Sequence, residues 1–212
     1  MRFTRSAGIR LAVVGALGLT VGLACNDSDP TGPGTGHLSV RLTDAPFPLD
    51  EVESIDVFVV RIDARNEASS DEDANEDLDG NGGGWVTIAT PNAAFNLMTL
   101  QNGVSVPLGG ADIAAGAYGS LRLILDTDLS SITLKNGTVL TGTSAPPIVF
   151  PSAGQSGLKV MLSQPILLDD GEELEVLIDF DASRSFVLRG NDILPNGLLF
   201  TPVIHATLID EE

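Results

Sequence analysis

The chain has 212 residues, of which 11 are Lys or Arg and 29 are Asp or Glu, so its formal net charge is −18. This acidic excess argues against binding to nucleic acid, which requires clustered basic side chains. The single Cys and the two His exclude a disulfide scaffold, a Cys-based zinc site and a His-rich metal centre. The 43% of hydrophobic residues can form a core, and 23 Gly with 12 Pro indicate many turns.

Residues 1–24 have the pattern of an export signal. Arginines at positions 2, 5 and 10 precede an uncharged stretch, Leu11–Ala24, which is too short to span a bilayer as a helix. Cys25, the only cysteine, follows directly. The order of basic residues, apolar residues, a small residue and Cys resembles a bacterial lipoprotein signal, which implies cleavage before Cys25 and acylation of its thiol.

A second interpretation of the leader stays open. Gly22 stands where the lipoprotein pattern prefers a branched aliphatic residue, and Gly22-Leu23-Ala24 also fits the small-x-small rule of an ordinary secretory signal. Cys25 would then be a free thiol of a secreted protein. In either case the net charge falls from −18 to −21, because the leader holds three arginines and no acid. Residues 25–36 contain no large apolar side chain and predict a flexible tether.

The first predicted strands follow the tether. Residues 37–43 alternate apolar and polar side chains, which is typical of a half-buried strand that ends before Pro46. Residues 54–62 are apolar on both faces near their middle, as in a central strand. A short polar turn is possible at 50–54, and residues 85–89 predict the next strand.

The segment between these strands, residues 65–84, is predicted to be an acidic loop inside the domain. From Glu67 to Gly84 it has seven acids and no Lys or Arg. Alternating oxygen side chains followed by Gly can wrap a Ca²⁺ ion, and two such sets occur: Asp77, Asp79 and Asn81, and the poorer Asp71 and Asp73. Ile88 stands where an EF-hand-type loop would have its last carboxylate. A solvated loop that binds no ion is therefore the alternative.

The later strands complete an all-β pattern. Strands are expected at residues 121–125, 132–140, 174–180 and 200–208. Asn136-Gly137 is a strong hairpin signal, and Pro202 places the start of the last strand at an edge or bulge. No window of eleven residues has a helical period, and the best helical candidate, 95–101, is two turns at most. We therefore expect one antiparallel β-sandwich or partly open barrel over residues 37–209, with an acidic tail at 210–212.

Few residues have the chemistry of a catalytic site. Asp44, Asp179 and Asp181 lie at predicted strand ends and could converge to bind a cation or to act in acid–base chemistry. The alternative for Asp44 and Asp181 is that each forms an Asx-type turn. The two imidazoles, His37 and His205, are expected at the surface.

The remaining motifs do not favour an enzyme. Trp85 and Tyr118 could offer a sugar platform but are more typical of core residues. The sequence has no G-x-S-x-G, no phosphate-binding loop and no strand–GxGxxG–helix unit. No catalytic residue is predicted.

Several segments together are similar to one bacterial family. Residues 36–46, GHLSVRLTDAP, resemble the opening of the DUF4382 domain. Further matching segments are residues 84–88, 113–123, 156–159, 179–182 and 202–204. The resemblance implies an exported, often lipid-anchored domain of unknown function. Residues 115–118, Ala-Gly-Ala-Tyr, also resemble prealbumin (transthyretin-like) β-sandwich modules, which implies a fold and no activity.

These observations predict an exported protein anchored through Cys25 in the cell membrane or the outer membrane, or secreted if Cys25 is not acylated. Its role is expected to be non-catalytic: binding of an envelope protein or glycan, or envelope structure. The alternative is an extracytoplasmic Ca²⁺-dependent module for carbohydrate or protein that uses the acidic loop. Neither interpretation involves nucleic acid.

Overall fold

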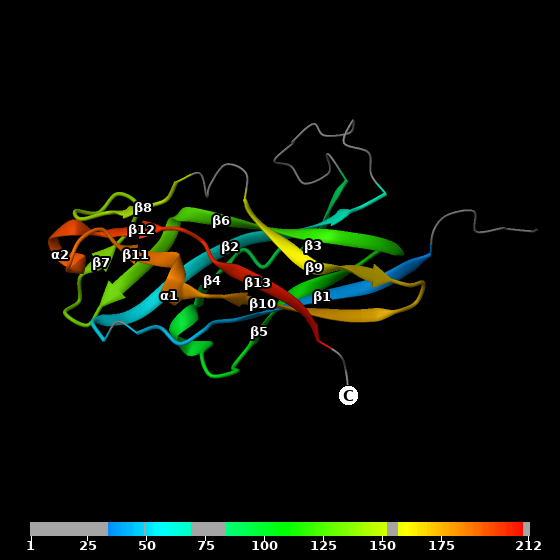
Figure 1. Cartoon of the computed structure of the whole chain (residues 1–212), viewed down its shortest axis with the longest axis horizontal. Helices are drawn as coiled ribbons and strands as arrows, with labels where there is room; N and C mark the ends of the chain where they lie inside the picture. The colour runs from blue at the N-terminus through cyan, green and yellow to red at the C-terminus, as the bar shows by residue number, and fades with distance from the viewer. Residues whose placement is uncertain (1–33, 49, 69–83, 152–156, 210–212) are drawn as a thin grey trace, which may run out of the picture. The chain divides into compact units, whose positions relative to one another are not determined.

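The computed structural model describes residues 34–48, 50–68, 84–151 and 157–209, and these residues form β-strands almost throughout (Figure 1). They belong to one compact unit of the chain, Gly32–Glu212. The all-β prediction is confirmed. Within the described ranges, no helix is both long and apolar enough to cross a membrane.

The first large sheet is built around β1 (Thr35–Thr43). Its alternating side chains put Leu38, Val40 and Leu42 into the core. β1 pairs antiparallel with β5 (Val106–Ala114) but parallel with β10 (Glu173–Phe180). β10 in turn pairs with the edge strand β13 (Ile204–Ile209). The sheet is therefore not purely antiparallel, because the second sheet is inserted in the chain between β1 and β10 as a long crossover.

The second large sheet has β2 (Val52–Asn66) at its centre, as its apolar middle predicts. One edge of β2 pairs with β6 (Gly116–Leu134), which includes the strand predicted at 121–125. The opposite edge pairs first with β4 and then with β3. The remaining members are short strands and one outer strand: β3 (Trp85–Ala89), β4 (Ala93–Asn96), β7 (Val139–Leu140) and β9 (Leu158–Leu168).

The predicted hairpin is present between β6 and β7. Gly137 lies in this turn with φ of +82°, a left-handed conformation that favours glycine. The turn closes with the Leu134 N–H donating to the Thr138 carbonyl at 2.8 Å. Upstream, β6 is one long strand with bulged pairing against β2, where two separate strands were expected.

A small third sheet caps one end of the two large ones. Its strands and the short helices beside it are β8 (Ile148–Val149), β11 (Phe186–Leu188), β12 (Leu198–Phe200), α1 (Ala182–Ser185) and α2 (Ile193–Asn196). The strand expected at 200–208 is divided between β12 and β13, because Pro202 cannot donate to a ladder. The helical candidate at 95–101 is the end of β4 followed by the 3₁₀ turn η2 (Leu97–Thr99), and the chain at 50–51 forms a turn before β2.

The two large sheets share one apolar core. β5 lies beside β3 at one edge of the sheets, and β13 lies beside β9 at the other. Tyr118 is fully buried, and its hydroxyl donates to the Ala114 carbonyl at 2.7 Å. Trp85 is also buried. Both aromatic residues are therefore core residues, as the sequence favoured, and neither offers a sugar platform. The prealbumin-type arrangement stays a prediction.

Candidate functional site

The ends of β1 and β10 bring three acidic residues close together. The two strands run parallel, with Thr43 opposite Asp179, so Asp44 leaves β1 beside the end of β10. Asp44 is only 3% exposed, and its Oδ1 accepts a hydrogen bond from the Ala182 N–H at 2.9 Å. This bond ties the end of β1 to the start of α1. We call Asp44, Asp179 and Asp181 the carboxyl cluster.

The Asx-type turn predicted at Asp44 is wrong. Such a turn needs the backbone N–H two residues onward, and that residue is Pro46, which has none. The carboxylate instead reaches Ala182, 138 residues along the chain. At Asp181 the hydrogen bond is local, but it comes from the Arg184 N–H three residues onward at 3.0 Å, so the carboxylate caps α1 where an Asx-type turn was predicted.

Burial raises the pKa of two members of the carboxyl cluster, Asp44 and Asp179. The pKa of Asp44 is raised to about 7, mainly by desolvation and further by the negative charges of Asp179 and Asp181. Hydrogen bonds from the Ala182 N–H and the Gln101 amide act in the opposite direction and lower it. Within the described chain, Asp44 Oδ2 and Asp179 Oδ1 are buried without a hydrogen-bond partner. A buried carboxylate of this kind is costly unless it takes up a proton.

The pKa of Asp179 is raised as well. Burial raises its pKa, the charge of Asp181 adds to the effect, and His205 opposes it. His205 lies opposite Asp179 on the paired strand and is exposed, as predicted. The other imidazole, His37, has a side chain that is 42% exposed, and its Nδ1 lies 2.7 Å from Asp112 Oδ1 on β5.

The carboxyl cluster is not arranged as a metal centre. Within the part of the chain that the structure describes, no three His, Cys, Asp or Glu side chains are placed to hold a metal ion. Asp44 is also too buried to meet a substrate. Asp44 can therefore hold a proton, and its hydrogen bond to the Ala182 N–H joins the end of β1 to α1.

A second buried acid, Asp63 on β2, has the opposite environment. It is fully buried, and its Oδ2 accepts from Arg122 Nη2 at 2.7 Å. Arg61 Nε lies 2.9 Å from Oδ1, and the Thr87 hydroxyl donates to the same oxygen at 2.9 Å. The Arg122 guanidinium in turn lies 4.5 Å from the centre of the Trp85 ring, a cation–π distance.

Sequence reasoning missed this charged cluster. The predicted strand ended at Ile62 and the predicted acidic loop began at residue 65, so Asp63 was assigned to neither. The available signal was the alternation of Arg61, Asp63 and Arg65, which share one face of a strand that continues past Ile62. Its partner Arg122 comes from β6, opposite Asp63 in the register, and that pairing is not visible in the sequence.

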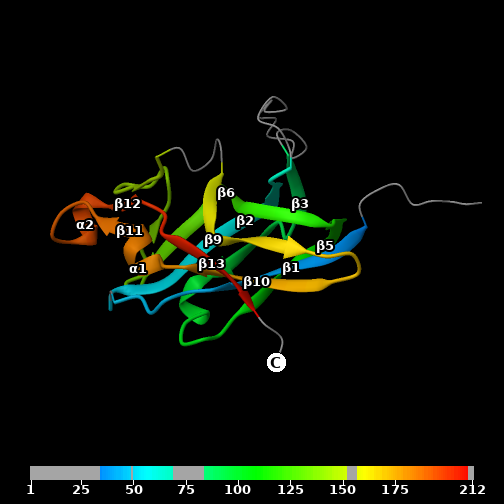
Figure 2. The same cartoon turned by 45° about the vertical axis from the view of Figure 1, so that its right-hand side comes forward.

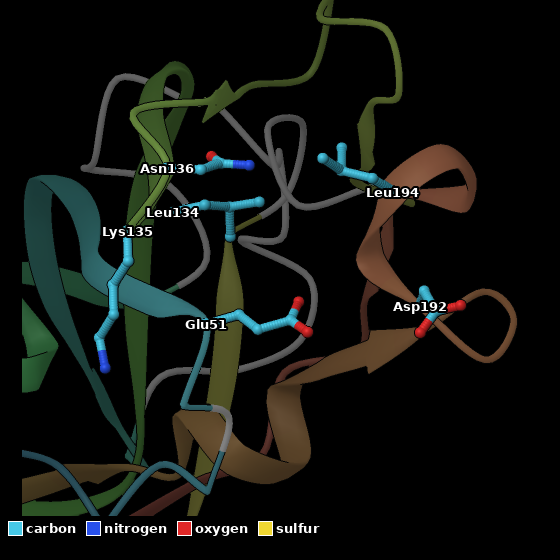
Figure 3. Close-up of a pocket in the computed structure, with 6 residues that line it drawn as sticks. All are labelled: Glu51, Leu134, Lys135, Asn136, Asp192 and Leu194. Atoms are coloured by element: carbon cyan, nitrogen blue, oxygen red, sulfur yellow. The ribbon is translucent and has the colours of Figure 1, made fainter.

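An open cleft of about 380 Å³ lies at the end of the domain that carries the third sheet (Figure 3). We call it the end cleft. Its lining residues come from the start of β2, the β6–β7 turn and α2: Glu51, Leu134, Lys135, Asn136, Asp192 and Leu194. Figure 3 shows the Glu51 carboxylate and the Leu194 side chain directed into the cleft, while the Lys135 ammonium lies away from both carboxylates. This cleft was not predicted from the sequence.

The remaining predicted site residues lie outside the described residues. They are the acylation candidate and the calcium candidates: Cys25, Asp71, Asp73, Asp77, Asp79 and Asn81. Their roles stay predictions.

Comparison with known proteins gives one match. A family model described as a domain of unknown function, DUF4382, matches residues 35–194. No curated protein and no solved structure matches the chain. The matched range includes Asp44, Asp63 and all six residues that line the end cleft.

Proposed function

The chain belongs to the DUF4382 family, and from this premise we propose that it is an exported, lipid-anchored cell-envelope protein whose β-domain binds a partner without catalysing a reaction. The family description assigns no activity. The proposal therefore depends on the leader, on Cys25 and on the arrangement of the domain behind it.

The observation that carries the proposal is that the start of β1 and the end cleft lie at opposite ends of the domain. β1 begins at one end, and the third sheet with α2 lies at the opposite end (Figures 1 and 2). Thr35 follows Cys25 by ten residues, a distance of at most about 35 Å when extended. An acyl chain on Cys25 would thus keep the start of β1 within that distance of the membrane, at the end of the domain opposite the end cleft (Figures 1 and 2).

The character of the titratable groups favours binding over catalysis. Asp44 has a pKa near 7, which is the value that general acid–base chemistry needs, but it is 3% exposed. The end cleft is open, its carboxylates come from exposed residues, and the described residues that line it include no Ser, Thr or Cys. An accessible cleft without such a group suits recognition of a partner.

The mass of the mature protein from its native membrane tests the proposal. We expect a chain that begins at Cys25 and carries a diacyl or triacyl modification, and we expect Cys25→Ala to move the protein to the soluble fraction. Ser28→Ala, a small change in the same tether, should leave it in the membrane. An unmodified, soluble chain would contradict anchoring and assign the protein to the secreted class.

A further inference from the structure

We propose that the end cleft binds a lysine or arginine side chain presented by an extended segment of a partner protein. This inference rests on the proposed binding function and names the ligand class for that site. The argument comes from three properties of the cleft: its unpaired carboxylates, its one oriented amide and its apolar floor.

Two carboxylates face the cleft without a cation of their own. Glu51 and Asp192 are exposed, and no described residue forms an ion pair or hydrogen bond with either carboxylate. Asp192 occupies the N-cap position of α2 yet makes no capping hydrogen bond, so its carboxylate is available. Lys135 also lines the cleft, but its ammonium lies away from both acids (Figure 3). Both carboxylates are therefore available to a cation that a ligand supplies.

The amide of Asn136 adds a donor of known orientation. Its Oδ1 accepts from the Thr138 N–H at 2.9 Å within the turn, so the Nδ2 group is the part that remains for a ligand. Figure 3 shows this nitrogen directed into the cleft toward Leu194. An N–H donor placed there suits a carbonyl oxygen of a peptide backbone, while the two carboxylates suit a basic side chain.

The apolar residues indicate what joins these two polar groups. Leu134 is buried at the base of the turn, and Leu194 is 38% exposed at the rim. Lys and Arg side chains bury their methylene stems on apolar surface while their charged ends stay near water. A volume of about 380 Å³ is near the lower end for ligand sites and fits one long side chain with a short stretch of backbone.

The alternatives fit less well. A metal ion would use the carboxylates but would leave the leucines without a role, and the described residues provide no three-ligand set. The net charge, −18 for the whole chain and −21 without the leader, attracts cationic partners from a distance and favours a basic polypeptide over an acidic one.

The test is titration of the full-length protein with acetyl-Leu-Arg-Leu-amide, followed by NMR, with the citrulline peptide as the uncharged control. We expect shifts that centre on Glu51, Asn136, Asp192 and Leu194 with the arginine peptide and much weaker binding of the citrulline peptide. Glu51→Gln and Asp192→Asn should each weaken binding on the order of tenfold, the loss of one charge-assisted hydrogen bond. Glu173→Gln, at the start of β10, is the matched control and should change nothing.

Three results would overturn the proposal: no binding of the arginine peptide, equal binding of the citrulline peptide, or equal weakening by Glu173→Gln. Each is independent of anchoring, because acylation of Cys25 is measured by mass. A failure at the end cleft is thus distinguishable from a failure of the proposed function.

Discussion

Two aspartates are buried among the described residues of this domain, and the charged groups near them have opposite signs. Asp63 on β2 is fully buried and contacts two guanidinium groups, those of Arg122 and Arg61. Asp44, which follows β1, is 3% exposed, and only one of its two carboxylate oxygens accepts a backbone hydrogen bond, from the Ala182 N–H. The charged groups that act on it are other carboxylates. The same residue type thus contacts cations in one place and lies near other carboxylates in the other.

The difference shows how the cost of a buried charge is offset. A buried carboxylate without compensation loses several kcal/mol of hydration. At Asp63 the compensation is cationic and comes from neighbouring positions of the same sheet. At Asp44 it comes from a proton, because burial raises the pKa to about 7. Changing the cation should therefore affect the first site strongly, whereas changing the pH should affect the second.

The largest effect is expected for Arg122→Met. The variant leaves Asp63 with Arg61 and removes the cation from the face of Trp85. Removing one partner of a buried ion pair costs about 3–5 kcal/mol of the free energy of unfolding. Denaturant-induced unfolding measures this loss.

The control for Arg122→Met is Arg184→Met. Arg184 is 67% exposed and lies 3.9 Å from Asp181, so its loss should cost no more than about 1 kcal/mol. Equal costs for the two variants would mean that the cation at Asp63 does not stabilise the fold.

The next effect is a pH dependence that originates at Asp44. The folded-state pKa of about 7 lies above the ordinary value of 3.8, so the stabilising contribution of its proton is complete below about pH 4 and is lost as the pH rises through 7. The raised pKa of Asp179 acts in the same direction. The wild type should therefore be more stable at pH 5 than at pH 8, on the order of 2 kcal/mol.

Asp44→Asn tests the origin of this dependence. Asparagine keeps an oxygen to accept from the Ala182 N–H but cannot carry a charge. The variant should have a flatter profile of unfolding free energy against pH and should exceed the wild type at pH 8. Asp128→Asn, a change at an exposed acid, should keep the wild-type profile. If Asp44→Asn also kept it, the pH dependence would not come from the carboxyl cluster.

The sequence predicts the strands of this fold better than its charged clusters, for a physical reason. Alternation of apolar residues depends only on near neighbours in the chain, and it identified the strands that contain Leu38 and Val176. The Asp44–Ala182 bond depends on two strands ending side by side, which requires the parallel pairing of β1 with β10. No local pattern in the sequence specifies that pairing. One feature could have been predicted from the sequence: Pro46 has no backbone N–H, which excludes an Asx-type turn at Asp44.

The end cleft illustrates the same limit. Asn136-Gly137 predicted the turn correctly, but its position opposite α2 follows from the third sheet, where β12 pairs with β8. The order of Leu194 and Asp192 in the sequence suggests no site by itself. Only the fold brings them to the same cavity as Glu51.

The smallest expected effect concerns the acidic loop, which follows β2 in the chain and leads to Trp85. If Asp77 and Asp79 bind Ca²⁺, the ion would neutralise acids close in sequence to the Asp63 site and would leave the carboxyl cluster unchanged. Thermal unfolding in millimolar Ca²⁺ should then occur a few degrees above that in EDTA, through preferential binding to the folded state. The pH dependence from Asp44 should be the same in both conditions.

The double variant Asp77→Ala with Asp79→Ala is the decisive sample for that loop, because it removes the proposed ligands and leaves the sheet unchanged. It should melt identically with Ca²⁺ and with EDTA. The matched control, Asp169→Ala with Asp170→Ala, removes the same charge after β9 and should retain the Ca²⁺ shift. Identical wild-type melting curves in Ca²⁺ and EDTA would exclude the calcium-dependent module. The loop acids would then contribute only to the net negative charge.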